Sequence, residues 1–173
     1  MRGFKGVTLI ELLVVLAIIA IALAWAMPHF GTMINKTRVT TTANDLVGAI
    51  AYARSLAVRN GRASVTICAN DGPDECDAVG NWNAGFMLFT DSNSNKTREP
   101  GEAINRRWEA VQSPVTLAAN VLAVTFKTDG TASPDTGALF IICDPTGKTS
   151  PRSVRVWGSG ANNLYSPQTC VLP

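Results

Sequence analysis

The sequence has few residues with which to perform acid–base or redox chemistry. Histidine occurs once, at His29, and no Ser-His-Asp, Cys-His or paired-carboxylate arrangement can be recognised. One histidine leaves little scope for acid–base catalysis near neutral pH. The cysteines include no CxxC pair, which removes support for thioredoxin-type chemistry and for the usual zinc spacing. The sequence therefore predicts a protein that is not an enzyme and uses no cofactor.

An excess of positive or negative charge is also lacking beyond the first few residues. The formal net charge of +2 reflects 15 basic and 13 acidic residues, and two of the basic ones, Arg2 and Lys5, precede the first apolar run. Without them the two signs balance at 13 each. This balance argues against a generally cationic surface for nucleic acid, and only local basic patches remain to be considered.

What the sequence does contain is a long apolar run directly after Gly6. From Val7 to Met27 only Thr8 and Glu11 interrupt 21 residues. A helix of that length is about 31 Å long, which is enough to span a bilayer. The charges and the glycine stand before the run, whereas a secretory signal peptide has its cleavage site after a shorter apolar core. Basic residues ahead of the run favour a cytoplasmic N-terminus and place the rest of the chain in the periplasm.

Glu11 is the most informative residue of this run, because a carboxylate costs about 2.5 to 3.5 kcal/mol at the centre of a bilayer and less near its interface. The stretch K-G-V-T-L-I-E-L-L-V-V resembles the signature of type IV prepilins, in which a basic leader ends in glycine and glutamate is the fifth mature residue. The resemblance implies cleavage by prepilin peptidase between Gly6 and Val7, N-methylation of Val7, and an assembly role for Glu11. Its carboxylate would compensate the Val7 amine of a neighbouring subunit. An interfacial glutamate on an ordinary anchor is the alternative.

The second half of the helical region has a different pattern. Pro28 stands where pilins usually carry a proline, and it predicts a bend or local break in the helix. Beyond it we expect an amphipathic helix that Asn60 and Gly61 end. Its apolar residues recur at helical spacing, with charged residues on other faces. The apolar set is Leu46, Ile50, Ala53 and Ala57, and the charged set is Lys36, Arg38, Asp45 and Arg54.

From residue 61 onward, short β-rich segments alternate with clusters of Gly, Pro, Asn and Asp. We expect strands at 63–69, 85–90, 104–108, 121–127, 138–143 and 154–157, forming an antiparallel sheet against the amphipathic helix. The segments T-T-A-N-D-L-V-G-A-I-A-Y-A-R-S-L-A-V-R-N-G, W-N-A-G-F-M-L-F-T-D-S-N-S-N and F-K-T-D-G resemble the GspH/FimT family. That family includes minor pilins of the FimU and FimT types and a minor pseudopilin of type II secretion.

The predicted fold class is α+β, the type IV pilin fold. A long N-terminal α-helix, transmembrane in its first half, would pack against a C-terminal antiparallel β-sheet head. The predicted division is a leader peptide at 1–6, a transmembrane and polymerisation helix at 7–27, an amphipathic helix at 28–60 and a periplasmic or extracellular head at 61–173.

All four cysteines follow the apolar run, so transport across an inner membrane would bring them into an oxidising compartment where disulfides persist. Four cysteines allow three connectivities. The pairs Cys68 with Cys76 and Cys143 with Cys170 are favoured, because the first bridge needs only a turn at 71–73 to close. The loop between the second pair matches in kind the disulfide-bounded region of many pilins.

One loop of the head is a candidate for calcium. Asp91, Asn93, Asn95 and Glu102 occupy positions 1, 3, 5 and 12 of a calcium-loop template and would supply oxygen ligands. Lys96, however, stands where the sharp turn of that template requires glycine. The same residues are typical of a polar hairpin loop whose side chains cap their own backbone, and we favour that interpretation.

A basic stretch near the C-terminus, G-K-T-S-P-R-S-V-R-V-W-G, contains Lys148, Arg152 and Arg155. Some FimT-type pilins bind DNA through an arginine-bearing motif near the C-terminus, which R-S-V-R partly resembles. A few basic residues beside an aromatic ring form a weak site for phosphate and stacked bases. No Gly-Arg pair precedes the second arginine, and the alternating valines also explain the segment as a strand with solvated arginines.

The resemblance implies a structural minor pilin that prepilin peptidase processes and that initiates type IV pili and stays at their tip. Such pili serve twitching motility and adhesion, and in some cases DNA uptake. The alternatives are a minor pseudopilin of type II secretion and a DNA-binding competence pilin. The implied partners are other minor pilins, the major pilin, prepilin peptidase, the inner-membrane assembly platform and the membrane itself. Before assembly the chain would cross the inner membrane once, and afterwards it would lie in an extracellular filament or at its tip.

Overall fold

The computed structural model describes residues 6–70, 72, 74–167 and 169–171, except for the side chains of 25–29. The chain divides into two compact units, Met1–Ile34 and Asn35–Pro173. Arg2 and Lys5 of the predicted leader lie outside the described residues.

Helix α1 runs from Leu9 to Asn60, and its ends follow from local chemistry. At the start, Thr8 is the N-cap residue, because its Oγ1 accepts the N–H of Glu11 at 3.3 Å. At the other end, Gly61 has φ +62°, the left-handed conformation that commonly ends a helix. The helix assignment continues through Pro28, but the bend predicted there falls among residues whose side chains are not described, so it stays a prediction.

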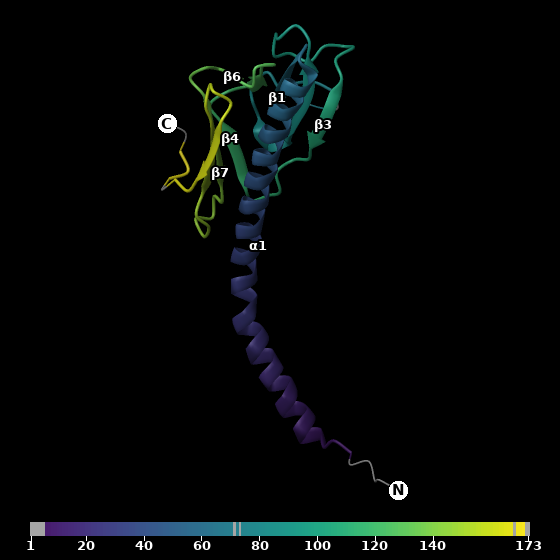
Figure 1. The fold of residues 1–173 in the computed structure, drawn as a ribbon. Coiled ribbons are helices and arrows are strands. Elements are labelled where there is room, and N and C mark those ends of the chain that lie inside the picture. Colours follow the sequence, from purple (N-terminus) through teal and green to yellow (C-terminus); the bar gives the residue numbers. More distant parts are fainter. Residues whose placement is uncertain (1–5, 71, 73, 168, 172–173) are drawn as a thin grey trace. The chain divides into compact units, whose positions relative to one another are not determined.

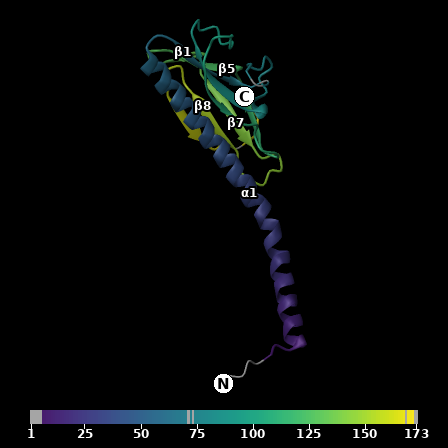
Figure 2. The ribbon, with the colours of Figure 1, turned by 90° about the vertical axis from the view of Figure 1, so that its right-hand side faces the viewer.

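Among the described residues, nine strands follow α1 and form two antiparallel sheets (Figures 1 and 2). The five-stranded sheet has the order β3-β2-β1-β5-β6 and the four-stranded sheet has the order β4-β7-β8-β9. The strands are β1 Ser64–Ala69, β2 Phe86–Asp91, β3 Ile104–Trp108, β4 Thr116–Ala119, β5 Ala123–Phe126, β6 Ala132–Ser133, β7 Ala138–Cys143, β8 Arg152–Val156 and β9 Asn162–Tyr165, with a 3-10 helix, η1, at Trp82–Ala84.

The head therefore contains two sheets where the sequence led us to expect one. Six of the strands lie at or close to their predicted positions, whereas β4, β6 and β9 were not predicted. The missed strands lack the usual signal: β6 has two residues and β9 reads N-N-L-Y with every residue exposed. Two sheets give the part of α1 within the C-terminal unit a concave apolar surface to pack against.

One core joins that part of α1 to the inner faces of both sheets. The four apolar residues predicted to form the buried face of the helix are all at most 1% exposed. Their partners on the five-stranded sheet include Val65, Ile67, Leu88, Val124 and Phe126, and those on the four-stranded sheet include Leu117, Phe140, Ile142, Val154 and Val156. Full burial of an aliphatic or aromatic side chain contributes about 1.5–3 kcal/mol, so this face holds the helix firmly to the head.

Polar contacts fix the same part of α1 at both ends of the head. Arg54 donates from Nε to the Gly130 carbonyl oxygen at 3.1 Å, and from its guanidinium NH2 group to the Ser159 carbonyl oxygen at 3.4 Å. Nearer the start of the unit, Arg38 donates to the Ser113 carbonyl. Two of the charged residues predicted to lie away from the apolar face thus bind the turns between strands.

Candidate assembly helix and head surfaces

The N-terminal unit presents an apolar helix without a covering layer from the described chain. Every described residue from 6 to 24 is exposed, including Val7 at 72% and Leu9 at 78%. An apolar surface of this extent marks a site of contact with lipid or with other protein. Among the described residues, none of the helices is both long and apolar enough to cross a membrane.

Glu11 has a structural environment that the sequence analysis did not consider. With Thr8 as the N-cap, Glu11 occupies the third helical position, so the two residues match the T-x-x-E pattern of a capping box. Its exposed carboxylate lies in the first turn, where the helix dipole favours negative charge. The four-residue spacing was readable in the sequence, and it means that Glu11 has a local role as well as the assembly role implied by the prepilin signature.

The structure joins Cys68 to Cys76 and Cys143 to Cys170, the pairing that the sequence favoured. The Cα atoms of the two pairs are 5.6 and 5.8 Å apart, within the usual range for a disulfide. Cys68 is buried on the outer face of the five-stranded sheet, beside Met87. The first bridge thus fixes the β1–β2 connection to that face.

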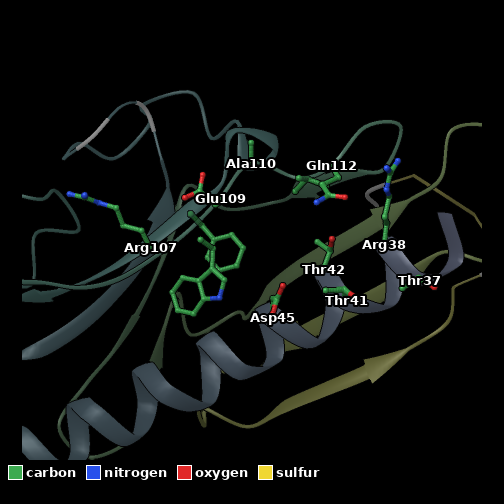
Figure 3. A pocket seen from close by; sticks show the side chains of 12 residues that line it. Thr37, Arg38, Thr41, Thr42, Asp45, Arg107, Glu109, Ala110 and Gln112 are labelled. Atoms are coloured by element: carbon green, nitrogen blue, oxygen red, sulfur yellow. The ribbon is translucent and has the colours of Figure 1, made fainter. Parts of the chain in front are cut away.

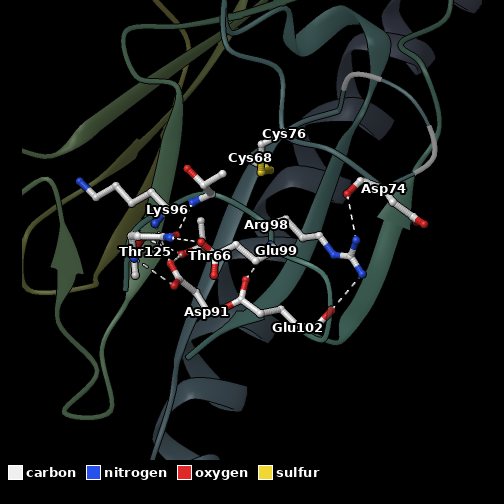
Figure 4. The surroundings of a disulfide bond; sticks show 12 residues. Thr66, Cys68, Asp74, Cys76, Asp91, Lys96, Arg98, Glu99, Glu102 and Thr125 are labelled. Carbon is white, nitrogen blue, oxygen red and sulfur yellow. Dashed lines mark hydrogen bonds between the residues drawn. A yellow bond between two sulfur atoms is a disulfide. The ribbon is translucent and has the colours of Figure 1, made fainter. Parts of the chain in front are cut away.

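The loop considered as a calcium candidate is closed by its own hydrogen bonds. Asp91, Lys96, Glu99 and Glu102 of this loop are seen near the first disulfide in Figure 4. Asp91 is fully buried, and its carboxylate accepts the N–H groups of Asn95 at 3.1 Å and Lys96 at 3.0 Å. Glu102 accepts the N–H of Ser92 at 2.8 Å. Oxygens that face N–H donors in this way are poorly placed to coordinate a cation.

The amide side chains of the same loop are also engaged. Asn93 and Asn95 donate their side-chain N–H groups to the carboxylate of Glu99, at 3.0 and 2.9 Å. Within the described part of the chain, no group of three or more His, Cys, Asp or Glu side chains is arranged to hold a metal ion. The hydrogen bonds fit the interpretation of the loop as a polar hairpin.

The C-terminal basic stretch does not form a single surface. Arg152 and Arg155 both belong to β8, and side chains three positions apart on a strand point to opposite faces of the sheet. Arg155 lies over the ring of Trp157, with 4.8 Å between guanidinium carbon and ring centroid. Lys148 is exposed in the connection between β7 and β8. The two arginines are therefore not arranged side by side as one phosphate site requires.

A contact that sequence reasoning missed holds α1 to the head close to the second disulfide. Asp144 is 2% exposed and accepts a hydrogen bond from the side-chain amide of Asn35 at 3.3 Å. It also accepts bonds from the hydroxyl and the N–H of Thr146, at 2.7 and 3.0 Å. Burial alone would raise the pKa of Asp144, but these hydrogen bonds outweigh it and hold the pKa below its ordinary value.

An open groove of about 500 Å³ lies between α1 and the segment after β3 (Figure 3). Phe86 and Trp108 stack at its base with ring centroids 4.9 Å apart. Asp45 and Arg38 of the helix face the segment that carries Glu109 and Gln112. The lining contains no nucleophile paired with a base, so nothing in the groove points to catalysis.

The fold is that of type IV pilins and pseudopilins, with a long N-terminal helix packed on antiparallel sheets. It is similar to the minor pilin FimU of Pseudomonas aeruginosa, which is 27% identical with a TM-score of 0.57 over 76% of this chain and 99% of FimU. A second FimU structure gives 23% identity and a TM-score of 0.60 over 79% of this chain and 97% of that one. The minor pseudopilin EpsH of Vibrio cholerae shares the fold at 8% identity, with a TM-score of 0.52 over 76% and 99% of the two chains.

Sequence comparison identifies the family. The model described as type II transport protein GspH matches residues 42–160, more than half of the chain, so the chain belongs to the GspH family. The prokaryotic N-terminal methylation motif matches residues 1–27. The pilin-like protein PilA1 of Thermus thermophilus is 30% identical over 98 residues, which span 57% of this chain and 55% of that protein. These families consist of structural subunits, and the chain is not an enzyme.

Proposed function

We propose that the chain is a minor pilin that takes part in starting a type IV pilus and is retained at its tip. In this proposal prepilin peptidase cuts between Gly6 and Val7, Val7 is methylated, and the exposed apolar helix first anchors the subunit in the inner membrane. The helix then packs among the helices of neighbouring pilins. The partners are other minor pilins, the major pilin and the assembly platform.

The observation that carries this proposal is the apolar helix of the N-terminal unit, exposed at every described position up to residue 24. Such a surface needs lipid or protein around it, and a filament supplies protein where a bilayer supplied lipid. The methylation motif over residues 1–27 supports processing at this end. The likeness to FimU over almost the whole of that chain supports the pilus rather than another assembly.

Glu11 provides the sharpest test, because its capping role and its assembly role can be separated. Glu11→Gln removes the charge but keeps a side chain that suits a capping box, whereas Thr8→Ala removes the N-cap and keeps the charge. Both variants would be expressed in a deletion strain. Mass spectrometry would establish whether the mature chain begins at a methylated Val7, and immunoblotting of sheared filaments would measure incorporation.

We expect both variants to be cleaved, Glu11→Gln to be at least tenfold depleted from filaments, and Thr8→Ala to be incorporated at close to the normal level. Normal incorporation of Glu11→Gln together with depletion of Thr8→Ala would show that the helix cap, and not the Glu11 charge, is needed for assembly. Normal piliation and twitching of the deletion strain, together with absence of the chain from sheared filaments of the wild-type strain, would refute the pilus role.

The second candidate is a minor pseudopilin of type II secretion, which the description of the matched family model favours. The two roles differ in the phenotype of the deletion. Loss of a pseudopilin would stop secretion of exported proteins and leave pili intact, whereas loss of the minor pilin would reduce pili and leave secretion intact. Measuring both in the same deletion strain separates them.

A further inference from the structure

A cationic cavity of about 350 Å³ lies in the head, at the end of the five-stranded sheet where β1 begins and β2 and β5 end. Three of its lining residues are basic: Arg62, Lys96 and Lys127. The other six are all hydroxyl residues, namely Ser64, Ser92, Ser94, Thr125, Thr128 and Ser133. Among the described residues, no carboxylate contributes to the lining.

The three basic side chains are not paired in salt bridges within the described part of the chain, although the charge of Lys127 acts on the nearby carboxylate of Asp129. Asp129, two residues beyond Lys127, is turned to its own loop, where its Oδ1 accepts the N–H and the hydroxyl of Thr131 at 2.9 and 2.7 Å. Cations that share a cavity repel one another, and an anion between them would relieve that repulsion.

A buried acid, Asp91, lies beside this cavity, but both of its carboxylate oxygens already accept hydrogen bonds. Besides the two N–H groups of its loop, Asp91 accepts the hydroxyl of Thr66 at 2.8 Å. Because Thr66 has only one proton to give, its 2.7 Å contact with Thr125 requires Thr125 to be the donor. Figure 4 shows this chain of hydroxyls running from Thr125 to Asp91. The Asp91 carboxylate therefore faces the donors of Thr66, Asn95 and Lys96.

Asp91 also sets the position of Lys96. The bond from the Lys96 N–H to Asp91 holds this residue at φ +68°, an uncommon conformation for a lysine, on the wall of the cavity. Ser94, at φ +59°, is held by a 2.8 Å contact between its Oγ and that of Ser64. The buried acid thus fixes a loop that carries one cation and one hydroxyl to the cavity.

We propose that this cavity binds a tetrahedral oxyanion, a phosphate or sulfate group. Three cations supply charge. The hydroxyls of Thr125, Ser64 and Ser94 are engaged with other hydroxyls, so the further donors are those of Ser92, Thr128 and Ser133. A volume of about 350 Å³ lies within the range of small-ligand sites, so the group can be free or carried on a small molecule. The cavity is separate from the C-terminal basic stretch, and its ligand is independent of whether the chain works in a pilus or in secretion.

The test uses the full chain purified in a nonionic detergent. Inorganic phosphate would be titrated at constant ionic strength against sodium chloride, with the melting temperature and calorimetric affinity as readouts. The triple variant Arg62→Gln/Lys96→Gln/Lys127→Gln should weaken phosphate binding at least tenfold. Lys148→Gln/Arg152→Gln/Arg155→Gln removes the same net charge elsewhere and should change it less than about twofold.

The single variant Lys96→Gln, whose side chain is exposed, covers the case in which the triple variant fails to fold, and it should weaken binding about threefold. Glucose 6-phosphate, titrated alongside, distinguishes a free phosphate ion from a phosphate group carried on a small molecule. Tighter binding of glucose 6-phosphate than of inorganic phosphate indicates a carbohydrate monoester, and equal binding indicates the free ion. Stabilisation by phosphate no greater than that by chloride would overturn the proposal. Equal losses of phosphate affinity in the two triple variants, or a loss of affinity in the control variant alone, would also overturn the proposal.

Discussion

At the scale of single residues, Asp144 connects the start of the C-terminal unit to the strand that carries the second disulfide. Its neighbour Cys143 is bridged to Cys170, and its carboxylate bonds to Asn35 on α1. Hydrogen bonds to a charged group contribute about 1.5–3 kcal/mol each in favourable cases. One side chain thus secures both the turn after β7 and the helix that enters the head.

We predict that Asp144→Asn lowers the free energy of unfolding by about 1–3 kcal/mol at pH 7, because its amide would face the Asn35 amide donor to donor. The folded-state pKa of Asp144 is lowered, so the carboxylate's contribution is complete above the unfolded pKa of about 3.9 and is lost as pH falls through the folded value. Urea unfolding of both forms between pH 7 and pH 2 should therefore show the difference shrinking below about pH 4.

Asp129 offers a matched control, because it makes the same two bonds to a threonine two residues on, but is exposed and makes no hydrogen bond to α1 among the described residues. Asp129→Asn should change stability by clearly less than Asp144→Asn. Equal effects would mean that the bond to Asn35 contributes nothing beyond the local turn.

The sequence predicted some of these residues and could not predict others. Glu11 and the cleavage position stand out because a charge or a glycine at the edge of an apolar run has few explanations. The bond between Asn35 and Asp144 joins positions 109 apart, and no local pattern predicts such a partner. Arg152 and Arg155 looked like one patch because the sequence places them close together, although a strand separates them to opposite faces.

At the scale of elements, the two disulfides stabilise the head to different degrees. They close loops with sequence separations of 8 and 27 residues. In the chain-entropy model such loops correspond to about 2.6 and 3.6 kcal/mol. The longer loop contains β8 and β9, so its bridge also keeps an exposed edge strand in place.

We predict that Cys143→Ala/Cys170→Ala lowers the free energy of unfolding by about 1 kcal/mol more than Cys68→Ala/Cys76→Ala, because the longer loop gains more freedom in the unfolded chain. Urea unfolding without reductant measures both, and each variant should also show a steeper dependence on urea as its unfolded chain expands. Cys68 is the more deeply buried, at 1% against 7% for Cys143. A larger loss from the Cys68 pair would thus mean that packing outweighs loop entropy.

The contrast between local periodicity and pairing with distant strands explains which elements could be predicted. The buried face of α1 repeats every three to four residues and was identified correctly, because periodicity reports burial. Strands β4, β6 and β9 are short or polar and owe their conformation to hydrogen bonds with β7, β5 and β8. Pairing with distant partners leaves little trace in local composition, so the second sheet was missed.

At the scale of the whole molecule, the proposed removal of the leader would change the balance of charge. The full chain has a formal charge of +2 and an isoelectric point near 8.4. Cleavage after Gly6 would remove Arg2 and Lys5 and leave 13 residues of each sign. The mature subunit would then exert little long-range repulsion on its own copies, which suits a chain that packs helix against helix.

We predict that the mature chain focuses close to neutral pH, more than one pH unit below the full chain, because two strongly basic side chains are lost while an α-amine is present in both forms. Isoelectric focusing of the chain from strains with and without prepilin peptidase measures the shift. Gly6→Val, which alters only the residue before the cut, should keep the full-length value even when the peptidase is present. Focusing at the same pH in all three samples would show that the leader is retained, and the Val7 amine that Glu11 is proposed to compensate would then not exist.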